Sequence, residues 1–580
     1  MTLVTSQAKR MARERRLLEE FASSTSTFTK QGWTKTAAGE LCLKFRLELS
    51  ICGFEGMLVY PGLFPDVPAY IRPQKFGESW SNHQYRGSGV LCLQYGPDNW
   101  DPSITGVDLV RSANTLLWSE VLTAIVPELE GVQSRHSSTF GSYLRSFPRR
   151  FIVTPGLRAI LAKSVSTSPI ILKVTSKFND GCSVSVATST GAMPVPIGDV
   201  PTCLATDRTN WAGWAVLVDS VDAFDVKIDN ATLKSSLGPA WPSTEDLGES
   251  IHYLVLHDAS GAIRAFLLWE GKEPGIRHCH TVDFETDHEQ RLPAAFGVLS
   301  EVRVAIVGLG SLGSKIAVSL ARAGVRRFSL VDDDVLAPQN LVRNELNWLD
   351  VGFSKVGAVE RELKRVALGV EVTTYESNIA GQENPLLTAE MCSDVAACTL
   401  IIDATANPQA FVVLAALSKR SKTAMVWGEV FAGGVGALMA RSRPALDADA
   451  LSIRTHINGV LATLPPVPEG RTANYGLEQG SEVYVASDAD VSALAAAMTQ
   501  FSLDALCAPQ DSAYPVAAYL IGYRKYWEFQ VPFDTRPIDC SGALLAADEL
   551  EPLTEAEVAD LDELNNAMED SASAADNGST

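Results

Sequence analysis

The stretch Val302-Arg-Val-Ala-Ile-Val-Gly-Leu-Gly-Ser-Leu-Gly313 decides the fold of the second half of this chain. A run of apolar residues leads directly into three glycines, Gly308, Gly310 and Gly313. We expect a buried strand, a tight turn and then a helix from Ser311 to Ala323 that ends at Gly324. Such a turn lets a phosphate group approach backbone N–H groups at the helix N-terminus. By itself the motif fits NAD dehydrogenases and many other nucleotide-binding enzymes.

The residues that follow favour ATP over NAD. The next strand, Phe328 to Asp332, ends in a carboxylate at the place where such folds hold a ribose hydroxyl. Beyond it come Asn340, Arg343 and Lys355. Cations here would neutralise the charge that develops on a triphosphate and its pyrophosphate leaving group, whereas a dehydrogenase has no need of them.

This spacing resembles the ThiF/MoeB and ubiquitin-activating superfamily. The resemblance implies a Rossmann-like adenylation domain with a parallel-centred sheet, in which Asp332 binds the ribose of ATP. It further implies that Asn340, Arg343 and Lys355 contact the phosphates, with Arg343 and Lys355 acting in catalysis.

The strand Leu400-Ile-Ile-Asp403 departs from the family pattern. The family commonly has two aspartates here, and the second one holds magnesium. In this chain Ala406 takes the second position, while Asp403 remains at the end of the strand. We assign Asp403 to magnesium on that ground.

The N-terminal part carries a second set of motifs. A helix-like segment and antiparallel strand patterns lead to the turn at Tyr60-Pro61, and a helix is expected from Gly106 to Val126. The run Gly89-Val-Leu-Cys92-Leu and the segment Asn99-Trp-Asp-Pro102 lie between them. Together these motifs resemble the ubiquitin-conjugating fold, and the resemblance makes Cys92 the nucleophile for thioester exchange.

One residue of that second resemblance differs from the family. The usual His-Pro-Asn is His83-Gln84-Tyr85 here, so the asparagine that supports the oxyanion is missing. Another donor must stabilise that intermediate, or the acceptor chemistry differs.

We therefore expect a multidomain protein of α+β and α/β class. The expected parts are a ubiquitin-conjugating-like domain at 1–150, a β-rich linker domain at 151–293, an adenylation domain at 294–540 and an acidic tail at 541–580. The linker domain offers no catalytic constellation, because the cluster His278-Cys279-His280 reads as an ordinary strand or loop.

This order of domains resembles the fused ligases of bacterial type II CBASS anti-phage systems. The resemblance implies that the C-terminus of a cGAS-like nucleotidyltransferase is attached to acceptor proteins, and that the chain forms a homodimer through its adenylation domain. A second thiol is needed to convert an acyl-adenylate into a thioester. Cys507 falls on an apolar helix face, whereas Cys540 follows a proline-containing segment where a mobile loop could carry its sulfur, and we favour Cys540.

Composition excludes several other classes. The 580 residues carry a net charge of −21, which argues against nucleic-acid binding because phosphate backbones are held by clustered Lys and Arg. No run approaches the length and hydrophobicity of a membrane span, and the N-terminus has no signal sequence, so we expect a cytoplasmic protein. The ten cysteines lack the spacing of a zinc site or of a disulfide framework.

Three alternatives stay open. A sulfur-carrier-activating adenylyltransferase of the ThiF/MoeB type would use the same nucleotide site without needing the Cys92 domain. An NAD-dependent oxidoreductase is disfavoured by Arg343 and Lys355. A non-catalytic scaffold that binds the tail of a partner is compatible with Ala406 and with the missing asparagine at Tyr85.

Overall fold

The computed structural model divides into two compact units, Met1–Ser146 and Phe147–Thr580. It describes residues 5–125, 144, 147–465 and 471–546, apart from short gaps. The gaps fall at 50–51, 76, 79, 82, 86–87, 165–167, 180, 192–194, 199, 201, 206–208, 226–227, 242–250, 270–273, 284–291, 474–475 and 480–481. The acidic tail expected after 541 therefore lies outside the described residues from 547 onward.

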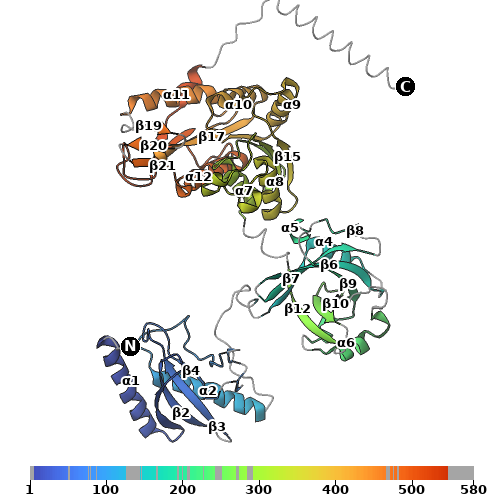
Figure 1. Ribbon diagram of the computed structural model, residues 1–580, viewed down its shortest axis with the longest axis vertical. Helices are drawn as coiled ribbons and strands as arrows, with labels where there is room; N and C mark the ends of the chain where they lie inside the picture. Colours follow the sequence, from blue (N-terminus) through green and yellow to red (C-terminus); the bar gives the residue numbers. More distant parts are fainter. Residues whose placement is uncertain are drawn as a thin grey trace, which may run out of the picture. The chain divides into compact units, whose positions relative to one another are not determined.

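The first unit is an antiparallel sheet of four strands in chain order, with a long helix before it and another after it (Figure 1). Apolar side chains from both helices and from the sheet share one core. Its elements are α1 (Thr5–Ser24), β1 (Phe28–Lys35), β2 (Leu41–Leu49), β3 (Cys52–Tyr60), β4 (Tyr70–Pro73) and α2 (Gly106–Ile125). The predicted helix from Gly106 is thus present.

A buried carboxylate joins three elements of this unit. Glu14 of α1 is fully buried and forms an ion pair of 3.0 Å with Arg10. It also accepts hydrogen bonds from the Tyr60 hydroxyl at 3.0 Å and from the backbone N–H of Gly106 at 2.7 Å. Because Tyr60 ends β3 and Gly106 begins α2, this one side chain fixes α1 against both.

The second unit begins with a sheet that closes on itself. Strand β5 pairs with β12 on one side and with β7 on the other, so seven strands form a closed ring, and β8 pairs with β7 at its rim. The elements are β5 (Arg149–Val153), α4 (Pro155–Ala162), β6 (Ile170–Asn179), β7 (Cys182–Thr190), β8 (Val195–Pro196), α5 (Thr202–Ala205), β9 (Thr209–Leu217), α6 (Asn230–Leu237), β10 (Ile251–His257), β11 (Ile263–Trp269) and β12 (Gly275–Asp283).

The cluster His278-Cys279-His280 lies on strand β12, as the sequence suggested. Cys279 is buried, and burial raises the pKa of its thiol to about 12. Among the described residues there is no group of three or more His, Cys, Asp and Glu side chains that could hold a metal ion. Cys279 belongs to the core of this sheet, whereas His278 and His280 on its opposite side are partly exposed.

The next sheet has the order β15-β14-β13-β16-β17-β18-β22-β23. Its first five strands are parallel and the last three are antiparallel. The strands are β13 (Arg303–Val307), β14 (Arg327–Val331), β15 (Glu371–Tyr375), β16 (Leu400–Asp403), β17 (Ala424–Phe431), β18 (Gly436–Ser442), β22 (Ala518–Gly522) and β23 (Asp534–Ile538). A separate small sheet contains β19 (Arg471–Ala473), β20 (Gly476–Gln479) and β21 (Glu482–Val485).

Helices cover both faces of this sheet (Figure 1). They are α7 (Gly313–Ala323), α8 (Lys355–Val366), α9 (Pro385–Ala396), α10 (Pro408–Ser421), α11 (Ala450–Thr463) and α12 (Asp488–Cys507). Along β13, Val304 and Ile306 face the core under α7, α8 and α12, whereas Ala305 and Val307 face the core under α9, α10 and α11. A strand buried on both faces explains the uninterrupted apolar run in the sequence.

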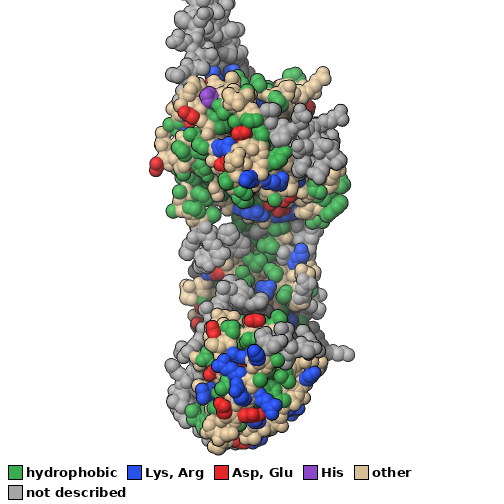
Figure 2. All heavy atoms as spheres, turned by 90° about the vertical axis from the view of Figure 1, so that its left-hand side faces the viewer, with side chains coloured by type: hydrophobic (Ala, Val, Ile, Leu, Met, Phe, Trp, Pro, Cys, Tyr) green, Lys and Arg blue, Asp and Glu red, His purple; other side chains and the backbone are tan. Residues whose placement is uncertain are grey.

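Basic side chains gather on the first unit although the whole chain is acidic. Lys9, Arg13, Arg15 and Arg16 of α1 are all exposed. Figure 2 shows Lys and Arg side chains concentrated on this part of the molecule. The negative charge of the chain is therefore unevenly distributed. In the described part of the chain, no helix has the length and apolar character that crossing a membrane requires.

Replacing Glu14 by alanine tests the junction in the first unit. The change leaves Arg10, the Tyr60 hydroxyl and the Gly106 N–H without their buried partner, which should lower the free energy of unfolding by about 3 kcal/mol. Hydrogen exchange followed by mass spectrometry should show faster exchange of the amides of β3 and α2 in the full chain. Glu20→Ala, at an exposed position of the same helix, is the control and should leave these amides unchanged.

Candidate nucleotide-binding site

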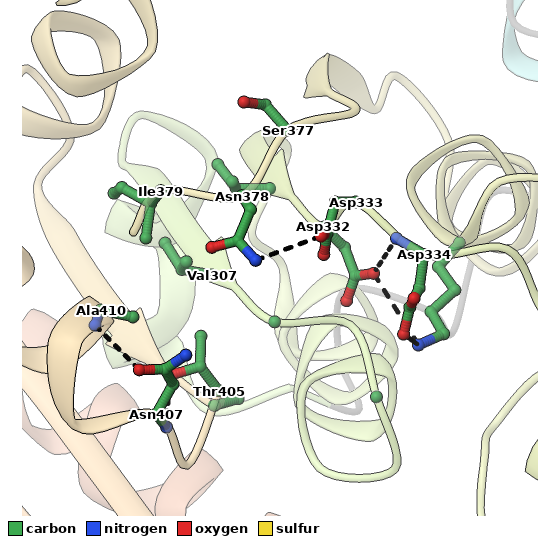
Figure 3. Close-up of a pocket in the computed structure, with 15 residues that line it drawn as sticks. Val307, Asp332, Asp333, Asp334, Ser377, Asn378, Ile379, Thr405, Asn407 and Ala410 are labelled. Atoms are coloured by element: carbon green, nitrogen blue, oxygen red, sulfur yellow. Dashed lines mark hydrogen bonds and ion pairs between the residues drawn. The ribbon is translucent and has the colours of Figure 1, made fainter. Parts of the chain in front are cut away.

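A pocket of about 190 Å³ opens at the carboxyl ends of the parallel strands. It lies where the chain order reverses, because β13 has β14 on one side and β16 on the other. Ligands of open α/β sheets bind at such switch points. The pocket is lined by Val307, Gly308, Gly310, Val331, Asp332, Asp333, Asp334, Lys355, Ser377, Asn378, Ile379, Ala404, Thr405, Asn407 and Ala410 (Figure 3).

The three glycines of the turn have different roles. Gly308 has φ +87°, and a Cβ atom there would lie 2.9 Å from the backbone of Ala404. A Cβ atom on Gly313 would lie 1.9 Å from the carbonyl oxygen of Gly308. At Gly310 a Cβ atom would meet nothing within 4 Å. Gly308 and Gly313 therefore allow close packing of the turn, whereas Gly310 presents its backbone to open space in the pocket.

Asp332 holds the glycine turn in place. Its Oδ2 atom accepts a hydrogen bond of 2.6 Å from the N–H of Leu309, and its Oδ1 atom accepts one of 2.9 Å from the N–H of Asp334. Burial raises the pKa of Asp332, although the Leu309 hydrogen bond and the charge of Lys355 act in the opposite direction. The carboxylate thus connects the end of β14 to the turn after β13.

Lys355 is the cation of the pocket. It is the first residue of α8, is 6% exposed, and its Nζ atom lies 2.6 Å from Asp334 Oδ2 and 3.8 Å from Asp332 Oδ1. A positive charge at a helix N-terminus is disfavoured by the helix dipole, so these two carboxylates compensate it. An anionic ligand entering the pocket would compete with Asp334 for the ammonium group.

Two residues predicted to contact phosphate do not line the pocket. Asn340 accepts a hydrogen bond of 2.9 Å from the N–H of Ala337 through its Oδ1 atom and so stabilises the turn Pro338–Val342. Arg343 donates a hydrogen bond of 3.0 Å to the carbonyl oxygen of Ala486. Of the predicted ligand-binding residues, the structure brings together Gly308, Gly310, Asp332 and Lys355, with Gly313 packed behind the turn.

Asp403 ends β16 but does not line the pocket. It is 5% exposed and accepts hydrogen bonds from the hydroxyl and N–H groups of Thr405, at 2.6 and 2.9 Å. Burial raises its pKa, while the Thr405 hydrogen bonds and the charge of Arg454 lower it. Ala406, three residues after Asp403, has φ 53°, so the backbone turns sharply where the family has its second aspartate.

The donor set around Asp403 does not fit a magnesium ion. A magnesium ion needs several oxygen ligands in octahedral geometry, and the Oδ1 atom of Asp403 already accepts both hydrogen bonds from Thr405. The described residues contain no cluster of three metal-ligating side chains. No chemical step is therefore assigned to a metal held by Asp403.

Several lining residues were missed by the sequence analysis. Asn378 points toward Asp333, and its Nδ2 atom donates a hydrogen bond of 3.1 Å to Asp333 Oδ2 (Figure 3). Asn407 accepts hydrogen bonds from the N–H groups of Gln409 and Ala410 and so caps α10. Both asparagines follow the ends of strands, β15 and β16, that meet at this edge of the sheet. A polar residue shortly after the end of a parallel strand was the sequence signal that could have identified both asparagines.

The candidate thiols differ sharply in exposure. Cys92 is partly exposed. Cys540 was expected on a mobile loop but is 6% exposed, two residues after β23, and its thiol donates to the Ile538 carbonyl oxygen at 3.6 Å. Burial and the nearby charges of Asp539 and Asp447 raise the pKa of Cys540 to about 11. Cys507 ends α12, is partly buried, and also has a raised pKa because of burial.

Comparison with known proteins identifies the domain that holds the pocket. The model of the ThiF family matches residues 293–463. This part of the chain is similar to the ThiF family. The pocket residues from Val307 to Ala410 all lie inside the matched range.

Two curated relatives match parts of the chain. The ATP-dependent ubiquitin transferase-like protein Cap2 of Enterobacter hormaechei subsp. hoffmannii (strain UCI 50) is 28% identical over 168 residues, which are 27% of each chain. The adenylyltransferase and sulfurtransferase MOCS3 of Mus musculus is 37% identical over 97 residues, which are 16% of this chain and 21% of that protein. The chain thus spans about a quarter of the length of these relatives. The matches confirm the predicted resemblance to the ThiF/MoeB superfamily and to a ubiquitin transferase-like protein.

Among solved structures, a crystal structure of PaaA has a TM-score of 0.33 at 17% identity. The match covers 44% of this chain and 78% of that one.

Substitution of Gly313 tests the packing of the turn. In Gly313→Ala the new methyl group would lie 1.9 Å from the Gly308 carbonyl oxygen, so the turn must shift. We expect ATP to bind about tenfold more weakly or worse, measured by anisotropy of a fluorescent ATP analogue. Gly459→Ala, where a Cβ atom meets nothing within 4 Å, should bind as the unmodified chain does. Unchanged binding by a folded Gly313→Ala chain would contradict this account of the turn.

The burial of Cys540 predicts its pH-dependent reactivity. With a pKa of about 11, roughly one thiol in a thousand is a thiolate at pH 8, and the fraction rises as the pH approaches 11. Iodoacetamide labelling, read by mass spectrometry, should therefore reach Cys540 long after the exposed thiols Cys52 and Cys203. Equal labelling rates at pH 8 would mean that Cys540 is accessible in solution.

Proposed function

We propose that this chain uses ATP to adenylate the C-terminal carboxylate of a protein partner and then conjugates the partner to amines of acceptor proteins. The observation that carries the proposal is the pocket of the ThiF domain, where an open glycine turn, the Asp332 carboxylate and a buried lysine converge. The similarity to Cap2, which is named as an ATP-dependent ubiquitin transferase-like protein, supports the same reading.

Different pocket residues would contact different parts of the nucleotide. Asp332 would accept hydrogen bonds from the ribose hydroxyls, because it ends the strand next to the glycine turn. The open backbone at Gly310 would approach the phosphates, and Lys355 would exchange its contact with Asp334 for phosphate oxygens. Magnesium, when bound to ATP, would neutralise phosphate charge.

In the reaction, an oxygen of the partner's carboxylate attacks the α-phosphorus of ATP. The bond from that phosphorus to the bridging oxygen breaks, so that an acyl-adenylate forms and pyrophosphate leaves. Negative charge grows on the pyrophosphate as it departs, and Lys355 is the buried cation that can stabilise it. In this scheme Asn340 and Arg343 act only if the turn that carries them moves, because neither lines the pocket.

A thioester relay completes the proposal. The thiolate of Cys540 would displace AMP, and Cys92 would then accept the acyl group before an amine attacks it. The partly exposed position of Cys92 supports its role in exchange with another protein. Cys540 must first become exposed, since its thiol is buried against the end of the sheet. The partner is proposed to be the C-terminal tail of a cGAS-like nucleotidyltransferase.

Exposed apolar side chains support a homodimer of the ThiF domain. Trp348, Leu349 and Phe353 are 73%, 75% and 55% exposed and lie within one short segment before α8. Large apolar groups concentrated in one surface segment are typical of interfaces. A second copy of the chain would bury them.

The similarity to MOCS3 favours a second candidate function. That relative is named as an adenylyltransferase and sulfurtransferase, so activation of a sulfur carrier would use the same pocket. Such an enzyme would form an acyl-adenylate and transfer sulfur without any acyl group passing to Cys92. The test below separates the two candidates by asking whether Cys92 becomes acylated.

The test incubates the full chain with ATP, magnesium and the candidate partner and measures AMP and thioesters by mass spectrometry. Lys355→Ala should reduce AMP formation by about 100-fold because it removes the buried cation. Lys364→Ala, on the exposed side of the same helix, is the matched control.

Cys92→Ala should retain AMP formation but lose the conjugate. If the unmodified chain forms AMP but no acyl-Cys92, the sulfur-carrier function is favoured. If it forms neither AMP nor acyl-Cys92, the chain is a non-catalytic scaffold.

A further inference from the structure

The segment from His83 to Cys92 folds back on itself through backbone pairing. Gln84 and Leu91 form an antiparallel bridge. Tyr85 donates its N–H to the carbonyl oxygen of Val90 at 2.8 Å, and Cys92 donates its N–H to that of His83 at 2.7 Å. Leu91 also donates to the Ile71 carbonyl oxygen of β4, which attaches this turn to the sheet. The position of Cys92 is therefore fixed by main-chain hydrogen bonds.

The register of this pairing determines which side chains share a face. Paired residues of antiparallel strands point to the same side, and their neighbours point to the other. Gln84 and Leu91 consequently face inward, and Leu91 is 2% exposed. His83, Tyr85 and Cys92 share the opposite face, where Tyr85 is 53% exposed. Tyr85 lies diagonally across from Cys92, at a separation that a tyrosine side chain can span.

The Tyr85 hydroxyl and the Cys92 thiol are electrostatic neighbours on this shared face. Burial raises the pKa of Tyr85 above its usual value, and the neighbouring Cys92 and Asp98 raise it further. The phenol thus keeps its proton at neutral pH and remains a hydrogen-bond donor beside the sulfur.

A second polar side chain of the turn, that of Gln84, is already occupied. Gln84 donates from Nε2 to the carbonyl oxygens of Glu78 and Gly89, at 2.9 and 2.8 Å. Its Oε1 atom accepts from the N–H of Trp80 at 2.9 Å. Gln84 therefore maintains the shape of the turn and has little capacity left to serve a reacting group.

We propose that the Tyr85 hydroxyl is the hydrogen-bond donor that stabilises the Cys92 thiolate and the oxyanion formed when Cys92 exchanges an acyl group. The proposal rests on the thioester relay proposed above and identifies a further catalytic residue for it. Tyr85 occupies the position of the asparagine that the His83-Gln84-Tyr85 pattern lacks, and a phenol supplies the same kind of donor as an amide N–H.

The chemistry balances at each step. The Cys92 thiolate attacks the carbonyl carbon of the incoming thioester, so that a new carbon–sulfur bond and an oxyanion form. The oxyanion collapses, the old carbon–sulfur bond breaks, and the donor cysteine leaves as a thiolate. In the second step an amine attacks, loses a proton to solvent and expels the Cys92 thiolate. Tyr85 keeps its proton throughout and only donates a hydrogen bond.

Transfer kinetics from preloaded Cys92 test this role. Tyr85→Phe keeps the ring and removes the donor, so it should slow single-turnover transfer by about 10- to 100-fold while leaving AMP formation unchanged. Tyr85→Asn restores an amide donor and should recover part of the rate. Tyr95→Phe makes the same chemical change three residues beyond Cys92 and should have no effect. A Tyr85→Phe rate equal to that of the unmodified chain would overturn the proposal.

A second measurement separates this proposal from the relay on which it rests. Iodoacetamide labelling of Cys92 in the full chain, without ATP or partner, reports the pH at which its thiolate forms. Loss of the Tyr85 donor should move that midpoint to higher pH, because the hydrogen bond favours the charged form. An unchanged midpoint in Tyr85→Phe would overturn the role of Tyr85. If the labelling midpoint shifts in Tyr85→Phe but Cys92 is never acylated in the transfer assay, the contact between Tyr85 and Cys92 stands and the thioester relay is rejected.

Discussion

The hydrogen bond from the Leu309 N–H to Asp332 is the interaction on which the site depends. It joins the turn after β13 to the end of β14, so both walls of the pocket are set by one carboxylate. The same carboxylate lies 3.8 Å from Lys355 and thereby helps to retain a cation at the start of a helix, where the helix dipole opposes it. A ligand that binds to Asp332 or Lys355 replaces contacts that these side chains already make, because both are paired before the ligand arrives.

The sequence predicted those parts of the site that are local in the chain. Gly308, Gly310 and Asp332 follow strands directly, and Lys355 begins a helix, so their positions depend on short-range rules. The contact of Arg343 is with Ala486, 143 residues away, and no local pattern reports such a contact. Asn378 was missed because the strand before it gives only a weak signal in the sequence. Its strand, β15, is short and largely exposed, so it carries no strong apolar signal.

The fold, like the site, could be predicted where it depends on local sequence but not where it depends on contacts between distant segments. The parallel half of the large sheet could be predicted because each of its buried strands is a continuous apolar run. The antiparallel strands β18, β22 and β23 could not be ordered, since β18 and β22 are separated by more than seventy residues in the sequence. Closure of the first sheet of the second unit depends on β5 pairing with both β12 and β7, and pairing between distant strands leaves no trace in periodicity.

The two candidate thiols place different demands on the protein. Cys540 is held against the Ile538 carbonyl oxygen, and burial together with two nearby carboxylates disfavours its thiolate. For its sulfur to reach an adenylate in the pocket, the segment after β23 must leave the end of the sheet, and local opening of this kind has a free-energy cost. Cys92 has no such barrier, because it is already partly exposed on a turn fixed by backbone hydrogen bonds. A relay through both thiols therefore has its conformational step at Cys540 and its electrostatic step at Cys92, where Tyr85 lies beside the sulfur.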